Sequence, residues 1–479
     1  MMLKLLLILV GLIALLAIIC VVRTLMVKPT AAKTATVELD ASPRAEEYGQ
    51  RLAQMIRQET ISSRYDPDRT KFYALHNKLE ELFPNIHAKC EKHDFNGSLL
   101  FKWTGTGEHA PVMLMSHQDV VEAGGTWEHE PFSGDIDEAG RVWGRGTVDT
   151  KASLFCLLTA VEELLDAGYT PACDVYFGGS CTEEWSGEGA PAMAQYLKDN
   201  GVHLALLLDE GGMIIEEPIA GVKGMYGMVG VVEKGYGDVK FIARSGGGHA
   251  SAPGKNTPLV RLGKFMTEVE QNDPFRSELT PTVREMFRRL MPNMKFGLRL
   301  VMANLWLFEP ILVKVLPSIS SAAGAMTRTT LAFTTAKGSD GLNVLPQEAY
   351  VTGNMRFIHH QANEESLKII SELAAKFDIE TEVIYQDTPC PIVEFDSDAF
   401  HLVEDVAAEI YPGVGICPYV MTGGTDAKYY KDVCDNCIRF APLYIDQQQY
   451  ASIHGLNENI FQGALPKGVD FYKRVIQKS

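Results

Sequence analysis

Residues 111–119 read PVMLMSHQD, and this stretch indicates the fold. Its first half is a short apolar strand, and His117 and Asp119 come directly after that strand. A helix and two further buried strands follow at 152–167 (ASLFCLLTAVEELLDA), 174–180 and 203–208. Strands that alternate with helices predict a three-layer α/β/α domain around a mostly parallel sheet.

The same pattern extends toward both ends of the chain. Apolar residues spaced by three and four predict helices at 43–59, 69–83, 397–410 and 465–477. We therefore expect the main α/β domain to consist of two pieces, residues 43–230 and 388–479.

The segment between these pieces has a different order of elements. Strands are predicted at 231–244, 329–336, 347–357 and 379–386, and helices at 258–271 and 363–377. This βαββαβ order is typical of a ferredoxin-like unit. The sequence therefore predicts a second domain at 231–387, inserted into the first.

An apolar insertion at 275–326 interrupts the second domain. It contains FGLRLVMANLWLFEPILVKVL, in which Arg299, Glu309, Pro310 and Lys314 break the apolar run, so a second membrane span is not expected. Two interpretations stay open. The segment forms helices packed on this second domain, hereafter the small domain, or it is an apolar lid that contacts an acyl chain or the bilayer surface.

The N-terminus contains an uninterrupted apolar run at 5–22. Its length approaches the roughly 20 residues that cross a bilayer as a helix, and it ends in Cys-Val-Val-Arg rather than in a typical cleavage site. A single-pass anchor is therefore favoured over a cleaved signal peptide or a core helix, with a tether at 24–42. The charges that flank the apolar run give only a weak indication of its orientation in the membrane. The four-residue tail before the run favours an orientation in which the rest of the chain lies outside the cytoplasm.

Composition excludes several classes of protein. The 479 residues include 44 Lys and Arg against 61 Asp and Glu, a net charge of −17, so nucleic acid is not an expected partner. The nine cysteines have no repeating spacing, which argues against a disulfide scaffold. Cys434 and Cys437 form a lone CxxC without a second ligand pair and are expected to be structural.

Acid and histidine side chains follow the apolar segments of the main domain in four places. These are His117–Asp119, the turn 144–151 (GRGTVDTK) with Asp149, Glu183–Glu184, and Asp209–Glu210. Because ligands bind beyond the carboxyl ends of strands in open α/β sheets, we expect these groups to converge. The glycine turn lacks the Walker ending, and there is no GxGxxG after a strand and no GxSxG elbow.

These motifs, together with GGHAS at 247–251 and HGLNE at 454–458, resemble the di-zinc amidohydrolases of metallopeptidase family 20. The resemblance covers about 45–479 and is strongest to the subgroup of carboxypeptidase S and the N-fatty-acyl-amino-acid hydrolase/synthase. It implies that the main domain is catalytic and that the inserted domain is a lid or dimerisation domain.

The resemblance also implies a site with two Zn²⁺ ions per subunit, with Co²⁺ or Mn²⁺ as alternatives. His117 and Asp209 would bind one ion, Glu184 and His454 the other, and Asp149 would bridge both. Carboxylate and imidazole ligands suit such a metal pair. Glu210, adjacent to Asp209, is an alternative ligand.

Three further residues would take part in catalysis. Glu183 would be the general base, and Asp119 would orient the imidazole of His117. His249 would stabilise the oxyanion in the site of a neighbouring subunit, which implies a homodimer formed through the lid domain.

Substrate contacts are expected from Asn343, Arg356, Gly424 and Thr425, with Arg356 suited to a free carboxylate. The sequence therefore predicts a membrane-anchored hydrolase of amide bonds in peptides or N-acyl amino acids that carry a free carboxylate. Two alternatives stay open: an aminopeptidase or dipeptidase of the same family, and a non-catalytic metal-containing peptide-binding protein.

Overall fold

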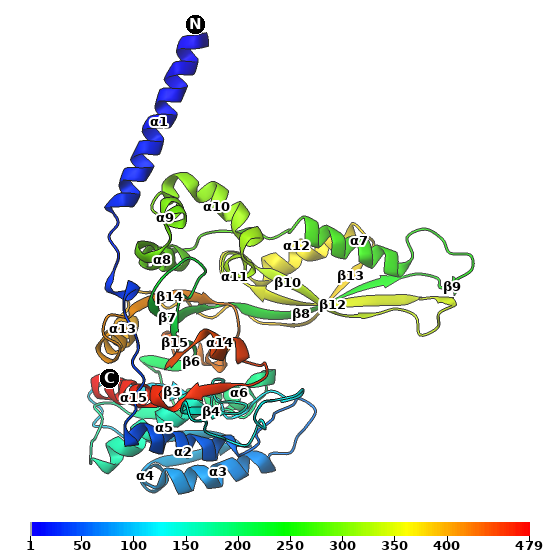
Figure 1. Cartoon of the computed structure of the whole chain (residues 1–479). Helices are drawn as coiled ribbons and strands as arrows, with labels where there is room; N and C mark the ends of the chain where they lie inside the picture. The colour runs from blue at the N-terminus through cyan, green and yellow to red at the C-terminus, as the bar shows by residue number, and fades with distance from the viewer. Residues whose placement is uncertain (1) are drawn as a thin grey trace.

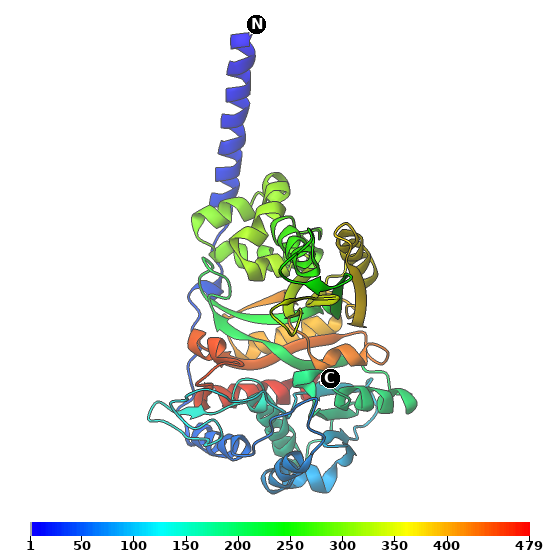
Figure 2. The same ribbon diagram turned by 90° about the vertical axis from the view of Figure 1, so that its right-hand side faces the viewer.

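The computed structural model describes residues 2–479 and has a mixed sheet at its centre (Figures 1 and 2). The strand order of this sheet is β1-β2-β5-β3-β6-β15-β7-β14. Its strands are β1 (Glu91–Phe95), β2 (Ser98–Trp103), β3 (Val112–Met115), β5 (Val175–Gly179), β6 (Leu206–Glu216), β7 (Met225–Glu233), β14 (Gly415–Met421) and β15 (Cys437–Ile445). Strands β5, β3, β6 and β15 are parallel, whereas β1–β2, β2–β5 and β15–β7 pair antiparallel.

Both faces of the sheet are buried, because successive residues of its strands belong to different apolar clusters. Leu99, Phe101 and Leu114 pack into the large core with α5 (Lys151–Asp166). Leu100 and Met113, which alternate with them, pack into a second cluster with α6 (Gly189–Asp199). This explains why the central strands are apolar at every position in the sequence.

The other elements of the main domain are mostly helices around the first core. They are α2 (Pro43–Ile56), α3 (Thr70–Leu82), α4 (Pro84–Lys89), α13 (Asp398–Ile410), α14 (Gln447–Ser452) and α15 (Leu465–Lys478), with the short strand pair β4 (Arg141–Trp143) and β16 (Asn459–Phe461). Two 3₁₀ turns, η2 (Glu183–Trp185) and η4 (Asp426–Tyr430), carry residues of the predicted site, and a third, η5 (Gln462–Ala464), precedes α15.

A second, four-stranded antiparallel sheet extends to one side (Figure 1). Its order is β10-β12-β8-β13, from β8 (Gly235–Arg244), β10 (Thr330–Lys337), β12 (Glu348–Phe357) and β13 (Glu380–Gln386). Helices α7 (Pro258–Gln271) and α12 (Asn363–Ala375) complete a βαββαβ unit with its own core. The single strand predicted at 231–244 is two strands, which divide at Lys234 between the two sheets.

The apolar insertion is helical, but its packing differs from the first interpretation of the sequence. It forms α8 (Pro281–Leu290), η3 (Met291–Asn293), α9 (Phe296–Met302), α10 (Leu305–Ile319) and α11 (Ser321–Ala325). α8 packs against β14 of the central sheet and α9 against the N-terminal helix α1. Val283 and Met286 belong to the large core of the main domain. The prediction that these helices pack on the small domain is therefore wrong.

The N-terminal helix α1 (Met2–Met26) is one continuous helix that projects from the body (Figures 1 and 2). It is long and apolar enough to cross a membrane, with a mean hydropathy of 3.5 and 6% of its apolar window buried. A signal sequence would have the same properties. The segment after it contacts the body through η1 (Ala31–Lys33), where Ala32 is buried, and through Thr30, which bonds with Asn293.

Candidate metal centre

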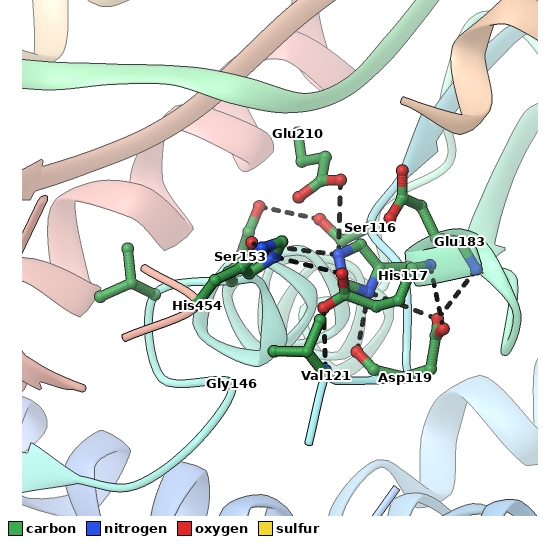
Figure 3. Close-up of polar contacts among 12 residues, drawn as sticks. Ser116, His117, Asp119, Val121, Gly146, Ser153, Glu183, Glu210 and His454 are labelled. Carbon is green, nitrogen blue, oxygen red and sulfur yellow. Dashed lines mark hydrogen bonds and ion pairs between the residues drawn. The ribbon is translucent and has the colours of Figure 1, made fainter. Parts of the chain in front are cut away.

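His117 stands directly after β3 and is buried at the centre of the predicted site (Figure 3). Its Nε2 lies 3.0 Å from Asp149 Oδ1 and 3.4 Å from Glu210 Oε1. Its Nδ1 lies 2.8 Å from the backbone oxygen of Asp119, which orients the ring. Burial opposes protonation of this ring, but the surrounding carboxylates, Glu210 first, raise the pKa of His117 well above its usual value.

A tight backbone approach places His117 at this position. A Cβ atom on Gly179, at the end of the neighbouring strand β5, would lie 1.8 Å from the backbone oxygen of Ser116. Only glycine allows β3 and β5 to approach so closely where both strands lead into the site.

Asp149 lies between two imidazoles. Its Oδ1 faces His117, and its Oδ2 lies 3.0 Å from Nε2 of His454. The same Nε2 is 3.1 Å from Glu184 Oε2. One carboxylate with a histidine at each oxygen is the arrangement expected of a ligand that bridges two metal ions.

The acid pair of η2 is held by Asp119. The carboxylate of Asp119 accepts hydrogen bonds from the backbone N–H groups of Glu183 and Glu184, both at 3.1 Å. It also lies 3.4 Å from Nδ1 of His117. Asp119 therefore ties the acid pair to the first histidine, beyond the role that the sequence suggested for it.

The structure separates Asp209 from Glu210. The carboxylate of Asp209 accepts hydrogen bonds from the backbone N–H groups of Glu210, at 2.8 Å, and Ala427, at 2.9 Å. The carboxylate of Glu210 instead approaches His117 (Figure 3). Of these two neighbours, the structure brings Glu210 into the cluster and not Asp209.

Glu458 is a structural residue of the site that sequence reasoning did not assign, although it ends the HGLNE motif. Its buried carboxylate accepts the N–H groups of Gly146, Val148 and Asp149 and pairs with Arg145 at 2.7 Å. These bonds hold the glycine-rich turn and thereby Asp149. Only the motif itself could have indicated this role, because the partners lie more than 300 residues away in the sequence.

The cluster fits metal ions. Two sets of ligand atoms each lie within 4.8 Å of one another: His117, Asp149 and Glu184, and His117, Glu183 and Glu210. Burial raises the pKa of Glu183 well above its usual value, raises that of Glu184, and raises that of Glu210 to about 8. Cations bound among these carboxylates would offset the free-energy cost of ionising them in a buried site. The oxygen and nitrogen donors suit Zn²⁺ or a similar ion.

Three of the predicted substrate residues lie together. A Cβ atom on Gly424 would lie 3.5 Å from a guanidinium nitrogen of Arg356, which stacks 4.6 Å above the Tyr236 ring. Thr425 donates its N–H and its hydroxyl to the buried carboxylate of Glu233, which also pairs with Arg439. Thr425 therefore anchors this loop, whereas Arg356 and Gly424 are partly accessible.

The other two predicted residues lie elsewhere. His249 is in β9 (Gly248–His249), which pairs with β11 (Val344–Leu345) at the far end of the small domain (Figure 1). The backbone oxygen of Asn343 accepts the N–H of Ala250, so these residues are neighbours. Both are exposed, and the structure does not bring them to the metal cluster of their own chain.

Comparison with known proteins agrees with this geometry. The model of peptidase family M20/M25/M40 matches residues 113–478. The chain belongs to this peptidase family. It is 32% identical to the N-fatty-acyl-amino acid synthase/hydrolase PM20D1 of Xenopus tropicalis over 98% of this chain and 94% of that protein.

Two further comparisons concern a second relative and the fold. It is 31% identical to the probable carboxypeptidase S-like 2 of Dictyostelium discoideum, over 90% of this chain and 85% of that protein. The solved M20 metallo-carboxypeptidase Sso-CP2 of Sulfolobus solfataricus has the same fold, with a TM-score of 0.66, 16% identity, and coverage of 90% and 98%. The chain is thus an M20 hydrolase of amide bonds, as the sequence predicted.

Proposed function

We propose that this M20 hydrolase is membrane-anchored and cleaves amide bonds next to a free carboxylate, as a carboxypeptidase or an N-acyl-amino-acid amidohydrolase. The observation that carries the proposal is Asp149 between His117 and His454, with Glu183, Glu184 and Glu210 around them. These residues form a largely buried set of donors for two cations, apart from half-exposed His454, and the carboxylate of Glu183 beside them can act as a base.

The proposed ligands follow from these distances. Asp149 would bridge two Zn²⁺ ions, Glu184 and His454 would complete one site, and His117 with Glu210 would complete the other. Asp209, the ligand that the sequence predicted, instead accepts hydrogen bonds from backbone N–H groups at both carboxylate oxygens. Removal of a direct ligand weakens binding more than removal of a supporting group. Glu210→Gln should therefore bind about one metal ion per chain instead of two, and Asp209→Asn should bind two; the reverse pattern would restore Asp209 as the ligand.

Bound metal ions would polarise the scissile carbonyl and bring the pKa of a water molecule near neutrality. The chain's own contribution is to position and move protons. Glu183 takes the proton of the attacking water and delivers it to the leaving amine. Its backbone is fixed by Asp119, and burial gives its carboxyl the raised pKa that a proton carrier needs at neutral pH.

Arg356 is the proposed partner of the substrate carboxylate. Its guanidinium is partly accessible and stacks on Tyr236, and Gly424 beside it lacks a side chain that would cover it. The same loop continues to Ala427, which donates to Asp209, the neighbour of Glu210. A carboxylate held at Arg356 is thus connected through one short loop to the metal cluster.

His249 and Asn343 are proposed to act in the site of a second copy of the chain. They are exposed at the end of the small domain, away from their own cluster. A homodimer through this domain would let His249 stabilise the oxyanion that forms on the partner's substrate. The helix α1 is the proposed single-pass anchor, with the body on the extracytoplasmic side.

The test compares an N-acyl amino acid with its C-terminal amide, with and without chelator. We expect chelator-sensitive release of the amino acid and strong preference for the free carboxylate. Equal rates on both substrates, or preference for a free amine, would favour a dipeptidase or aminopeptidase. Bound metal without turnover of any substrate would favour a binding protein.

A further inference from the structure

Helices α9 and α10 expose large apolar side chains at the surface of the body. Phe296 is 46% exposed, Ile311 62% and Ile319 72%. The two helices are bent by 108° at the break between them, so they form a hairpin-like unit instead of one straight helix. An apolar patch of this kind marks an interaction site.

The exposed side chains follow one face of α10. Ile311, Val315 and Ile319 are spaced by four residues and exposed, whereas Leu312 and Leu316 are buried against the body. The helix is therefore held by its inner side, and its outer apolar face is exposed. This is the pattern of an interfacial amphipathic helix.

The break between α9 and α10 docks on the end of α1. Asn304 is buried there and donates hydrogen bonds to the backbone oxygen of Cys20, at 3.1 Å, and to the hydroxyl of Thr24, at 3.3 Å. Arg23 donates to the backbone oxygen of Ala303. These bonds fix the apolar hairpin to the anchor helix itself.

The position of this contact along α1 sets the depth. The apolar run 5–22 spans about 27 Å as a helix, and Cys20 and Thr24 lie at its body-side end. Figures 1 and 2 both place α9 and α10 beside that end of α1. A bilayer crossed by α1 would therefore meet the hairpin at its headgroup layer.

The charges of the hairpin suit that layer. Between Phe296 and Ile319 the charged residues are Arg299, Glu309 and Lys314. Glu309 is paired with Arg284 of α8, whereas Lys314 is exposed and can meet lipid phosphates. Lys295 and Lys28, both exposed, flank the hairpin and the anchor.

We propose that α9 and α10 form an interfacial platform, which lies in the headgroup layer with Ile311, Val315 and Ile319 immersed in lipid. This rests on the proposed membrane anchor α1. The platform would hold the body in one orientation against the bilayer, whereas α1 alone, with its linker at 27–30, would act as a single attachment.

The experiment uses the full chain in liposomes with a nitroxide label on single introduced cysteines. Ile311→Cys is the test and Ile384→Cys is the control. Ile384 lies on β13 of the small domain and is 55% exposed, similar to Ile311 at 62%. The native cysteines are buried except Cys90, which is partly buried, so an exposed cysteine labels preferentially. Val315→Cys replaces Ile311→Cys if that variant does not fold.

We expect collisions with oxygen relative to a water-soluble nickel chelate to be several-fold higher at position 311 than at 384. Leu12→Cys in α1 serves as the reference for lipid. A lipid-exposed label at 12 with a water-exposed label at 311 would overturn the platform and leave the anchor intact. Water exposure at both positions would overturn the anchor and the platform together.

Discussion

The metal cluster and the far end of the small domain hold the predicted chemistry in opposite settings. Around Asp149, the side chains of His117, Glu184, Glu210 and His454 each meet an oppositely charged partner within about 3.5 Å, and all but half-exposed His454 are largely buried. His249 is exposed on a two-residue strand, and its ring accepts only the N–H of Ser251 among the described contacts. The cluster is therefore complete within one chain, whereas a catalytic His249 requires a second chain.

The largest effect should come from the cluster. Glu183→Gln removes the proton carrier but keeps the side-chain volume and the Asp119 contact to its backbone. We expect kcat to fall by about 10²–10⁴-fold with unchanged metal content, measured by amino-acid release and metal analysis. Glu108→Gln, at an exposed loop of the same domain, is the matched control and should keep full activity. An active Glu183→Gln would remove Glu183 from the mechanism.

A somewhat smaller effect is expected at the far end of the small domain. His249→Ala should lower kcat by about 10²–10³-fold, the usual effect of one lost oxyanion donor. His203→Ala, an exposed histidine of the main domain, should have no effect.

Co-expression of His249→Ala with Glu183→Gln connects the two regions. In a mixed dimer one site receives an intact Glu183 and an intact His249, so the mixture should regain about a quarter of the normal activity. Recovery requires that His249 acts across the dimer. No recovery, with mixed dimers verified by differential tags, would place His249 outside the partner's site.

The smallest effect is expected where the two domains meet. Arg356→Ala should raise KM for a carboxylate substrate by about 10- to 100-fold, because a hydrogen bond to a charged group contributes about 1.5–3 kcal/mol. The same variant should barely change the kinetics of the amide-capped substrate. Arg244→Ala on the same sheet is the control, since among residues 2–479 Arg244 forms ion pairs only with Glu348 and Glu380. An equal loss on both substrates would mean that Arg356 acts on the fold.

Local pattern in the sequence predicted the main domain and the acids near the strand ends, whereas His454 was assigned to the cluster only through the family resemblance. β3 and β5 carry no charged residue, and His117 and the pair Glu183–Glu184 follow them, whereas Asp209 and Glu210 lie within β6 instead of after it. The boundary at Lys234 was missed, because β7 and β8 form one continuous β-like run that is divided only by its three-dimensional path.

Other features depend on contacts that the pattern does not contain. Asp209 and Glu210 are adjacent acids, and the sequence does not show that Asp209 accepts hydrogen bonds from Glu210 and from Ala427, 218 residues later, whereas Glu210 enters the cluster. The apolar character of α9 and α10 was evident, but not that they would pack on α1 through Asn304. The apolar composition of a helix indicates that it is buried or membrane-bound, but it does not identify the surface that the helix packs against.

The most direct test of metal-dependent hydrolysis uses the unaltered chain and Glu183→Gln. Metal content and amide hydrolysis are measured on the same preparation, before and after chelation. We predict about two metal ions per chain in both proteins. We also predict hydrolysis only in the unaltered chain, lost with the metal and regained when Zn²⁺ is returned. Hydrolysis that survives complete metal removal would contradict a metal-dependent mechanism at this cluster.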